Sequence, residues 1–154
     1  MVEDNNNSCH TFYRCEYHCG GRAANDIVKT DLLVETKDQL FRVSVKAKQK
    51  QSWPKVKGIW QAGDLLVFVD YKGKEITTPP DFYVLDVPAW KKVVAKKRKN
   101  DPSAKINNEN TLFWPAHEEG QKDIWTGCQV SVADVAEFKD AWPDLNFPTD
   151  MPKQ

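Results

Sequence analysis

The sequence lacks any apolar run long enough to cross a membrane, which takes about 20 residues in a helix. It also lacks a net charge, because 22 Lys and Arg side chains balance 22 Asp and Glu side chains. Its first residues, MVEDNNNSCH, have neither the basic start nor the apolar core of a signal peptide. We therefore expect a cytoplasmic protein that does not enter the membrane.

Cysteine is scarce outside one cluster near the start of the chain. Three of the four cysteines lie there with two histidines, as Cys9, His10, Cys15, His18 and Cys19. These are enough soft ligands for zinc, which binds about four in a tetrahedron. The paired C-x-x-C spacing of a structural zinc site is missing, however. We do not expect zinc, and we expect residues 1–20 to be irregular or disordered.

Signatures of nucleophilic catalysis and of nucleotide binding are missing as well. No serine lies in a nucleophile elbow, and no cysteine stands out beside a histidine as a nucleophile. The segment GKEITTPP (73–80) lacks the G-x-x-x-x-G-K-[ST] spacing of a phosphate-binding loop. The sequence therefore argues against acyl transfer and against nucleotide binding by such a loop.

Charge is unevenly distributed along the neutral chain. Residues 42–57 hold six basic side chains and no acid, and residues 91–99 hold six more basic side chains. A local basic patch attracts phosphates whatever the net charge, so we expect a nucleic-acid partner. Acids dominate the C-terminal part, which leaves open a protein-interaction or inhibitor function.

The centre of the sequence predicts strands. DLLVET (31–36) and QLFRVSVKAK (39–48) flank a short polar turn and predict a hairpin. DLLVFVDY (64–71) and DFYVLDV (81–87) are nearly continuous apolar runs, typical of strands covered on both faces. A further short strand is expected at 111–114.

A loop and two helices complete the predicted elements. Residues 49–63 contain a proline and two glycines and predict a loop with short extended pieces. PAWKKVVAKKRK (88–99) starts with proline and ends with basic residues, as helices often do. Ser131 and Asp134 have the spacing of a capping box, which predicts a final amphipathic helix over 132–142.

Together these elements predict an α/β fold in which helices flank a mixed β-sheet. The length suits one domain. We place this domain at residues 21–145, followed by a C-terminal tail at 146–154.

The hairpin brings a carboxylate close to a lysine. A two-residue turn pairs positions whose numbers add to 75, which places Asp31 opposite Ser44 and puts both on one face with Lys46. Asp31 and the carbonyl of Val45 can hold a hard divalent cation, while Lys46 stabilises charge on a phosphate. The alternative is an exposed ion pair of Asp31 with Lys46 or Arg42, which would contribute little.

Four segments in order, TDLLVET, LFRVSVKAK, DLLVFVDY and PDFYVLDV, resemble the core of the PD-(D/E)xK, or restriction-endonuclease-like, nuclease superfamily. More narrowly, they are similar to a group of small bacterial proteins with an Asp strand and V-x-V-K, FVFVD and PDFYVL segments. The resemblance covers about residues 30–98. It implies a restriction-endonuclease-like mixed sheet, Mg²⁺ or Mn²⁺ as cofactor, and hydrolysis of nucleic acid, with DNA as the first choice.

The resemblance also implies roles for single residues. Asp31 matches the metal-binding aspartate, Lys46 the catalytic lysine, and Val45 the residue whose carbonyl adds a ligand. Ser44 stands where the family has Glu or Gln, and a hydroxyl is an uncharged, poorer ligand. A catalytically degenerate fold that binds nucleic acid or protein is therefore the alternative. The candidates for an additional carboxylate are Glu16, Asp26 and Glu35.

The basic segment supplies the expected nucleic-acid contacts: Arg42, Lys48, Lys50, Trp53, Lys55 and Lys57. Trp53 and Trp60 flank two of these lysines, and aromatic rings among lysines can stack on unpaired bases. The alternative for both tryptophans is packing in the core. A homodimer also stays open.

Overall fold

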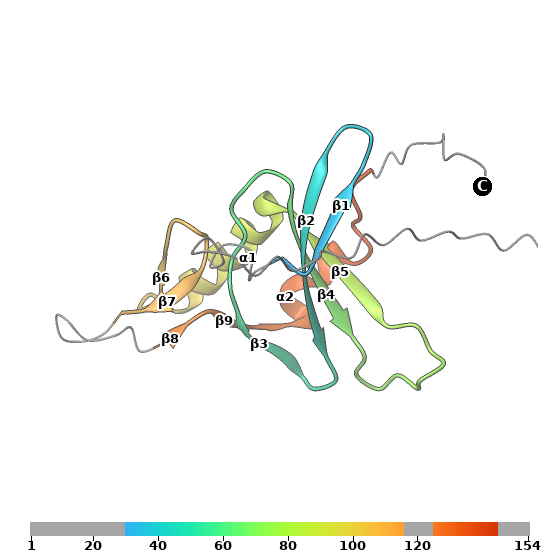
Figure 1. The fold of residues 1–154 in the computed structure, drawn as a ribbon. Helices are drawn as coiled ribbons and strands as arrows, with labels where there is room; N and C mark the ends of the chain where they lie inside the picture. The colour runs from blue at the N-terminus through green and yellow to red at the C-terminus, as the bar shows by residue number, and fades with distance from the viewer. Residues whose placement is uncertain (1–29, 116–124, 145–154) are drawn as a thin grey trace, which may run out of the picture.

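The structure is a computed structural model and describes residues 30–115 and 125–144 (Figure 1). The cysteine and histidine cluster, the domain boundary at residue 21 and the tail at 146–154 lie outside these residues. No helix in the described ranges is long and apolar enough to span a membrane.

A four-stranded mixed sheet forms the centre of the fold, as predicted. Its strand order is β1-β2-β4-β5. The strands are β1 (Leu32–Glu35), β2 (Leu40–Lys48), β4 (Asp64–Asp70) and β5 (Asp81–Leu85). β2 and β4 run parallel, and the other two neighbouring pairs are antiparallel.

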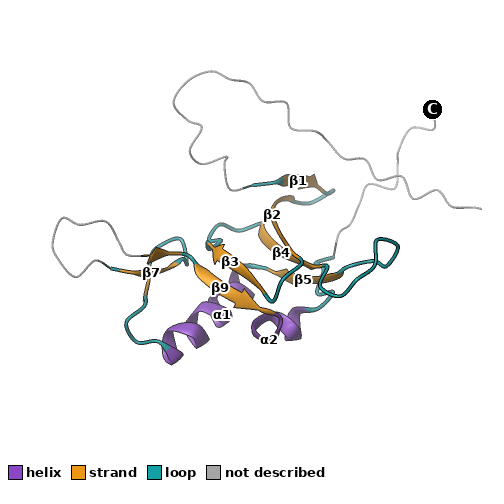
Figure 2. Cartoon of the chain, turned by 90° about the horizontal axis from the view of Figure 1, so that it is seen from below, coloured by secondary structure: helices purple, strands orange, loops and turns teal. Residues whose placement is uncertain are grey.

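Smaller elements surround this sheet. β3 (Ser52–Val56) pairs with β9 (Cys128–Ser131), and β7 (Leu112–Trp114) lies between β6 (Lys105–Ile106) and β8 (Trp125–Thr126). The helical elements are α1 (Val87–Asn100), α2 (Val132–Val135) and the 3-10 turn η2 (Ala136–Phe138). Both helices lie on the same side of the four-stranded sheet (Figure 2).

The sequence predicted α1 correctly. Asp86 caps its first turn, where Oδ1 accepts a hydrogen bond from the backbone N–H of Ala89 at 2.9 Å. Pro88 lies in the first turn. The last turn holds Lys97, Arg98 and Lys99, whose positive charges stabilise the carbonyl end of the helix.

The predicted final helix is too long, since helical structure ends at Phe138 instead of 142. The helix ends there because the following residues form hydrogen bonds with the edge of β5. Lys139 forms a β-bridge with Tyr83, and the N–H of Asp140 donates to the carbonyl of Phe82 at 3.0 Å. Asp140 takes a φ of 52°, which breaks the helical path.

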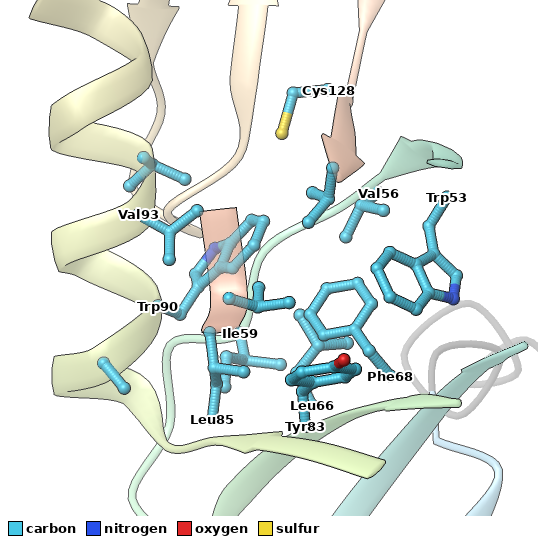
Figure 3. Packing of buried hydrophobic residues seen from close by; sticks show 14 of the residues in the cluster. Trp53, Val56, Ile59, Leu66, Phe68, Tyr83, Leu85, Trp90, Val93 and Cys128 are labelled. Atoms are coloured by element: carbon cyan, nitrogen blue, oxygen red, sulfur yellow. The ribbon is translucent and has the colours of Figure 1, made fainter. Parts of the chain in front are cut away.

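Apolar side chains pack on both faces of the sheet at β4, which explains why this strand is buried along its whole length. On one face, Leu66 and Phe68 pack with Trp90 of α1 and with residues of β3 and β9 (Figure 3). On the other face, Val43 of β2 packs with Leu65 of β4. The near-continuous apolar sequence of β4 is therefore correctly interpreted as a doubly covered strand.

A capping box starts α2, as the sequence predicted. Asp134 Oδ2 accepts hydrogen bonds from the N–H and the hydroxyl of Ser131, at 2.8 and 2.9 Å, and from Lys97 Nζ at 2.8 Å. Burial alone would raise the pKa of Asp134, but the hydrogen bonds from Lys97 and Ser131 hold it below its ordinary value. This carboxylate therefore ties α2 to α1.

We expect Asp134→Asn to lower the stability at neutral pH and to weaken its acid dependence. Because the folded pKa is lower than the unfolded value of about 3.9, the stabilisation is present above about pH 4 and is lost as the pH falls through the folded pKa. Urea unfolding at pH 7 and near pH 3 measures both effects. Glu137→Gln, an exposed acid in η2, is the control and should keep the native acid dependence.

Candidate metal and phosphate site

The hairpin of β1 and β2 has the predicted register. Leu33 lies opposite Arg42 and Val34 opposite Phe41, so paired positions add to 75. Phe41 is buried and Val34 packs on the same cluster. The alternation of apolar and polar residues thus fixes which face of β2 enters each core.

Asp31 lies directly before β1 and holds the edge of β2. Its Oδ2 accepts a hydrogen bond from the backbone N–H of Val45 at 2.6 Å, and its own N–H donates to the carbonyl of Val43 at 2.9 Å. The N–H and C=O of one strand residue point to the same side, so the Val45 carbonyl faces the edge where this carboxylate lies. Asp31 Oδ1 has no hydrogen-bond partner among the described residues.

Lys46 and Ser44 flank the residue that Asp31 contacts. Lys46 is half-buried and lies across from Phe68, and no acid pairs with its ammonium group in the described part of the chain. Ser44 is buried, with 8% of its surface exposed, across from Leu66. The three residues proposed from the sequence therefore gather around one stretch of β2.

Two of the cations predicted to bind phosphates form ion pairs within the sheet. Arg42 Nε lies 2.7 Å from Asp64 Oδ1, and Lys48 Nζ lies 2.6 Å from Asp70 Oδ1. Only 2% of the Lys48 side chain is exposed, so the phosphate contact expected of Lys48 is wrong. Sequence reasoning missed both acids. Both ion pairs could have been found from spacing, because Arg42 and Lys48 are as far apart in sequence as Asp64 and Asp70 on the parallel strand.

Trp53 corrects a second expectation. It lies on β3, in the segment predicted as a loop with short extended pieces, and only 1% of it is exposed. Its ring packs 4.9 Å from the ring of Phe68, and Lys48 Nζ lies 4.5 Å from its centroid. Trp53 is therefore a core residue and cannot stack on bases. Trp60 is half-buried, and its backbone N–H donates to Asp64 Oδ2.

The remaining predicted contacts are exposed. Lys50, Lys55 and Lys57 lie on the surface, and Lys55 Nζ is 5.0 Å from the ring centroid of Trp125. Glu35 is exposed on β1 across from Leu40, farther along the hairpin than Asp31. The other suggested carboxylates, Glu16 and Asp26, lie outside the described residues.

Within residues 30–115 and 125–144, no group of three or more His, Cys, Asp or Glu side chains could hold a metal ion. Burial raises the pKa of the Cys128 thiol to about 11, so this cysteine stays protonated at neutral pH. Mg²⁺, however, usually keeps several waters and binds through one or two carboxylates and the phosphates of a substrate. Asp31 and the Val45 carbonyl fit such a partial site.

Comparisons with protein-family models, with curated proteins and with solved structures found no match.

We expect Lys48→Met to destabilise the protein by about 3 kcal/mol, because it leaves the carboxylate of Asp70 buried without its counter-charge. Urea unfolding at neutral pH measures the loss. Lys50→Met, which changes an exposed lysine two residues away, should change stability by less than about 0.5 kcal/mol. Equal effects of the two substitutions would contradict a structural role for the Lys48 and Asp70 pair.

Proposed function

We propose that the chain is a restriction-endonuclease-like domain that hydrolyses phosphodiester bonds of nucleic acid, DNA first, with Mg²⁺ or Mn²⁺. The main support is the arrangement at the edge of β2. The Asp31 carboxylate accepts from the Val45 N–H, the Val45 carbonyl points to the same side of the strand, and Lys46 follows directly. Two oxygens and an ammonium group that no described acid neutralises suit a cation and a phosphate together.

Each residue of this site has a role in the proposal. A bound divalent ion would activate water and polarise the phosphate. Asp31 would hold the ion, and the Val45 N–H fixes its carboxylate by donating to Oδ2. Lys46 orients the attacking water and stabilises the charge that develops on the phosphate. The exposed lysines of the basic segment, Lys50, Lys55 and Lys57, bind neighbouring phosphates.

Purified protein should cleave DNA or RNA in the presence of Mg²⁺ or Mn²⁺, and Lys46→Ala should lower the cleavage rate at least about 100-fold. Release of product from a labelled substrate measures the rate. Lys105→Ala is the matched control, because Lys105 is an exposed lysine on a strand of another sheet. Cleavage that persists in Lys46→Ala would assign the activity to another site or to a contaminant.

Ser44 favours a second candidate function, a catalytically degenerate domain that binds nucleic acid or protein. The family position for a second carboxylate carries a buried hydroxyl here, so Asp31 is left as the single carboxylate at this edge among the described residues. One carboxylate binds a divalent ion more weakly than two. A domain of this kind would bind oligonucleotides in a salt-sensitive way without cutting them.

Under this second candidate, we expect Ser44→Glu to create metal-dependent cleavage in a protein that otherwise shows none, because it supplies the missing charged ligand. Ser44→Met is the control, since it adds similar volume without an oxygen. Thermal unfolding of both variants checks that the larger side chain is accommodated. A folded Ser44→Glu protein that still fails to cleave would show that the edge of β2 does not form a metal site.

A further inference from the structure

An exposed tryptophan and a lysine meet on the surface formed by β3 and β8, which come from distant parts of the sequence. Trp125 of β8 is 47% exposed, and Lys55 Nζ lies 5.0 Å from its ring centroid. Trp125 pairs across the strands with Trp114, and the Gly127 N–H donates to the Leu112 carbonyl at 2.8 Å. The ring is therefore presented from a strand with both of its ends fixed.

The backbone around this pair is unusually shaped. Lys55 has a φ of 51°, and the pairing of β3 with β9 shifts register between Trp53 and Val56. Such a bulge redirects a side chain, and a left-handed conformation is costly for a residue other than glycine. A Cβ on Gly127 would lie 2.9 Å from the backbone of Lys55. Gly127 thus permits the close approach that brings Lys55 to the tryptophan.

The two strand segments that carry the pair are cationic. Residues 52–57 and 125–131 contain no acid, and Lys57 is exposed beside Lys55. β3 leads away from the foot of β2 toward β9 and β8 (Figure 1). Lys55 and Lys57 therefore lie at the far end of the basic segment that begins with Arg42 on β2.

We propose that Trp125 and Lys55 form a binding site for an unpaired nucleobase and its phosphate. The exposed ring offers a face on which a base stacks, and Lys55 and Lys57 attract the backbone next to it. A nucleic acid is favoured over a protein partner because two exposed lysines, Lys55 at the ring and Lys57 two residues farther along, can both contact a phosphate backbone. The inference rests on the proposed function, for which it specifies a single-stranded region of the substrate.

Binding of a fluorescein-labelled oligothymidine of about 15 nucleotides, followed by anisotropy at low salt without divalent metal, tests this site. Trp125→Ala should weaken binding roughly 10-fold, which is typical for loss of one stacked base. Trp125→Phe should keep most of the affinity. Lys55→Ala should reduce the slope of log affinity against log salt by about 0.7, as expected for one lost phosphate contact.

Trp142→Ala is the matched control, because Trp142 is also 47% exposed but packs against Phe82 at a ring distance of 5.9 Å. The Trp142→Ala variant should bind the oligothymidine as tightly as the native chain does. Equal weakening by both alanine substitutions, or no binding by the native chain, would overturn the nucleobase site. Cleavage that depends on Lys46 is measured separately, so the proposed hydrolysis can stand where this site fails.

Discussion

The parallel pairing of β2 with β4 determines the rest of the structure, and an ion pair holds it at each end. Arg42 faces Asp64 where the pairing begins, and Lys48 faces Asp70 where it ends. A slip by one residue would break both pairs and exchange the faces of β2. The register also decides that Phe41 and Val43 enter one core while Ser44 and Lys46 lie on the opposite face. The position of the candidate site thus follows from the register of β2 against β4.

Because of these two ion pairs, some cations of the basic segment stabilise the fold and others remain for binding. Arg42 and Lys48 neutralise acids of β4, and Lys48 also lies above the ring of Trp53. Lys46 stands between them on the same strand without a described acid beside it. The same alternating strand therefore stabilises the sheet with two of its cations and presents another to a ligand. A buried pair such as Lys48 and Asp70 is costly to form, but breaking it is costlier, which favours one register over its neighbours.

Local sequence signals predicted the elements whose causes are local. The two-residue turn and the alternation of β2 predicted the correct hairpin register, and Pro88 marked the start of α1. Failures came where distant segments meet. Trp53 is buried because β3 pairs with β9, and the final helix ends early because Lys139 joins the edge of β5. No local pattern could place Trp125 beside Lys55. The sequence therefore located the candidate site better than the surface around it.

The hydrogen bond between Asp31 and Val45 has a consequence for how such a site can change over time. Its donor is a main-chain N–H, which every residue except proline supplies. Substitutions at position 45 therefore leave the carboxylate anchored, and drift at position 44 alters the chemistry without moving the anchor. An acid at position 44 could therefore be gained or lost on an unchanged scaffold. The geometry at this edge of the sheet is inherited with the backbone, while the charge of the site is free to evolve.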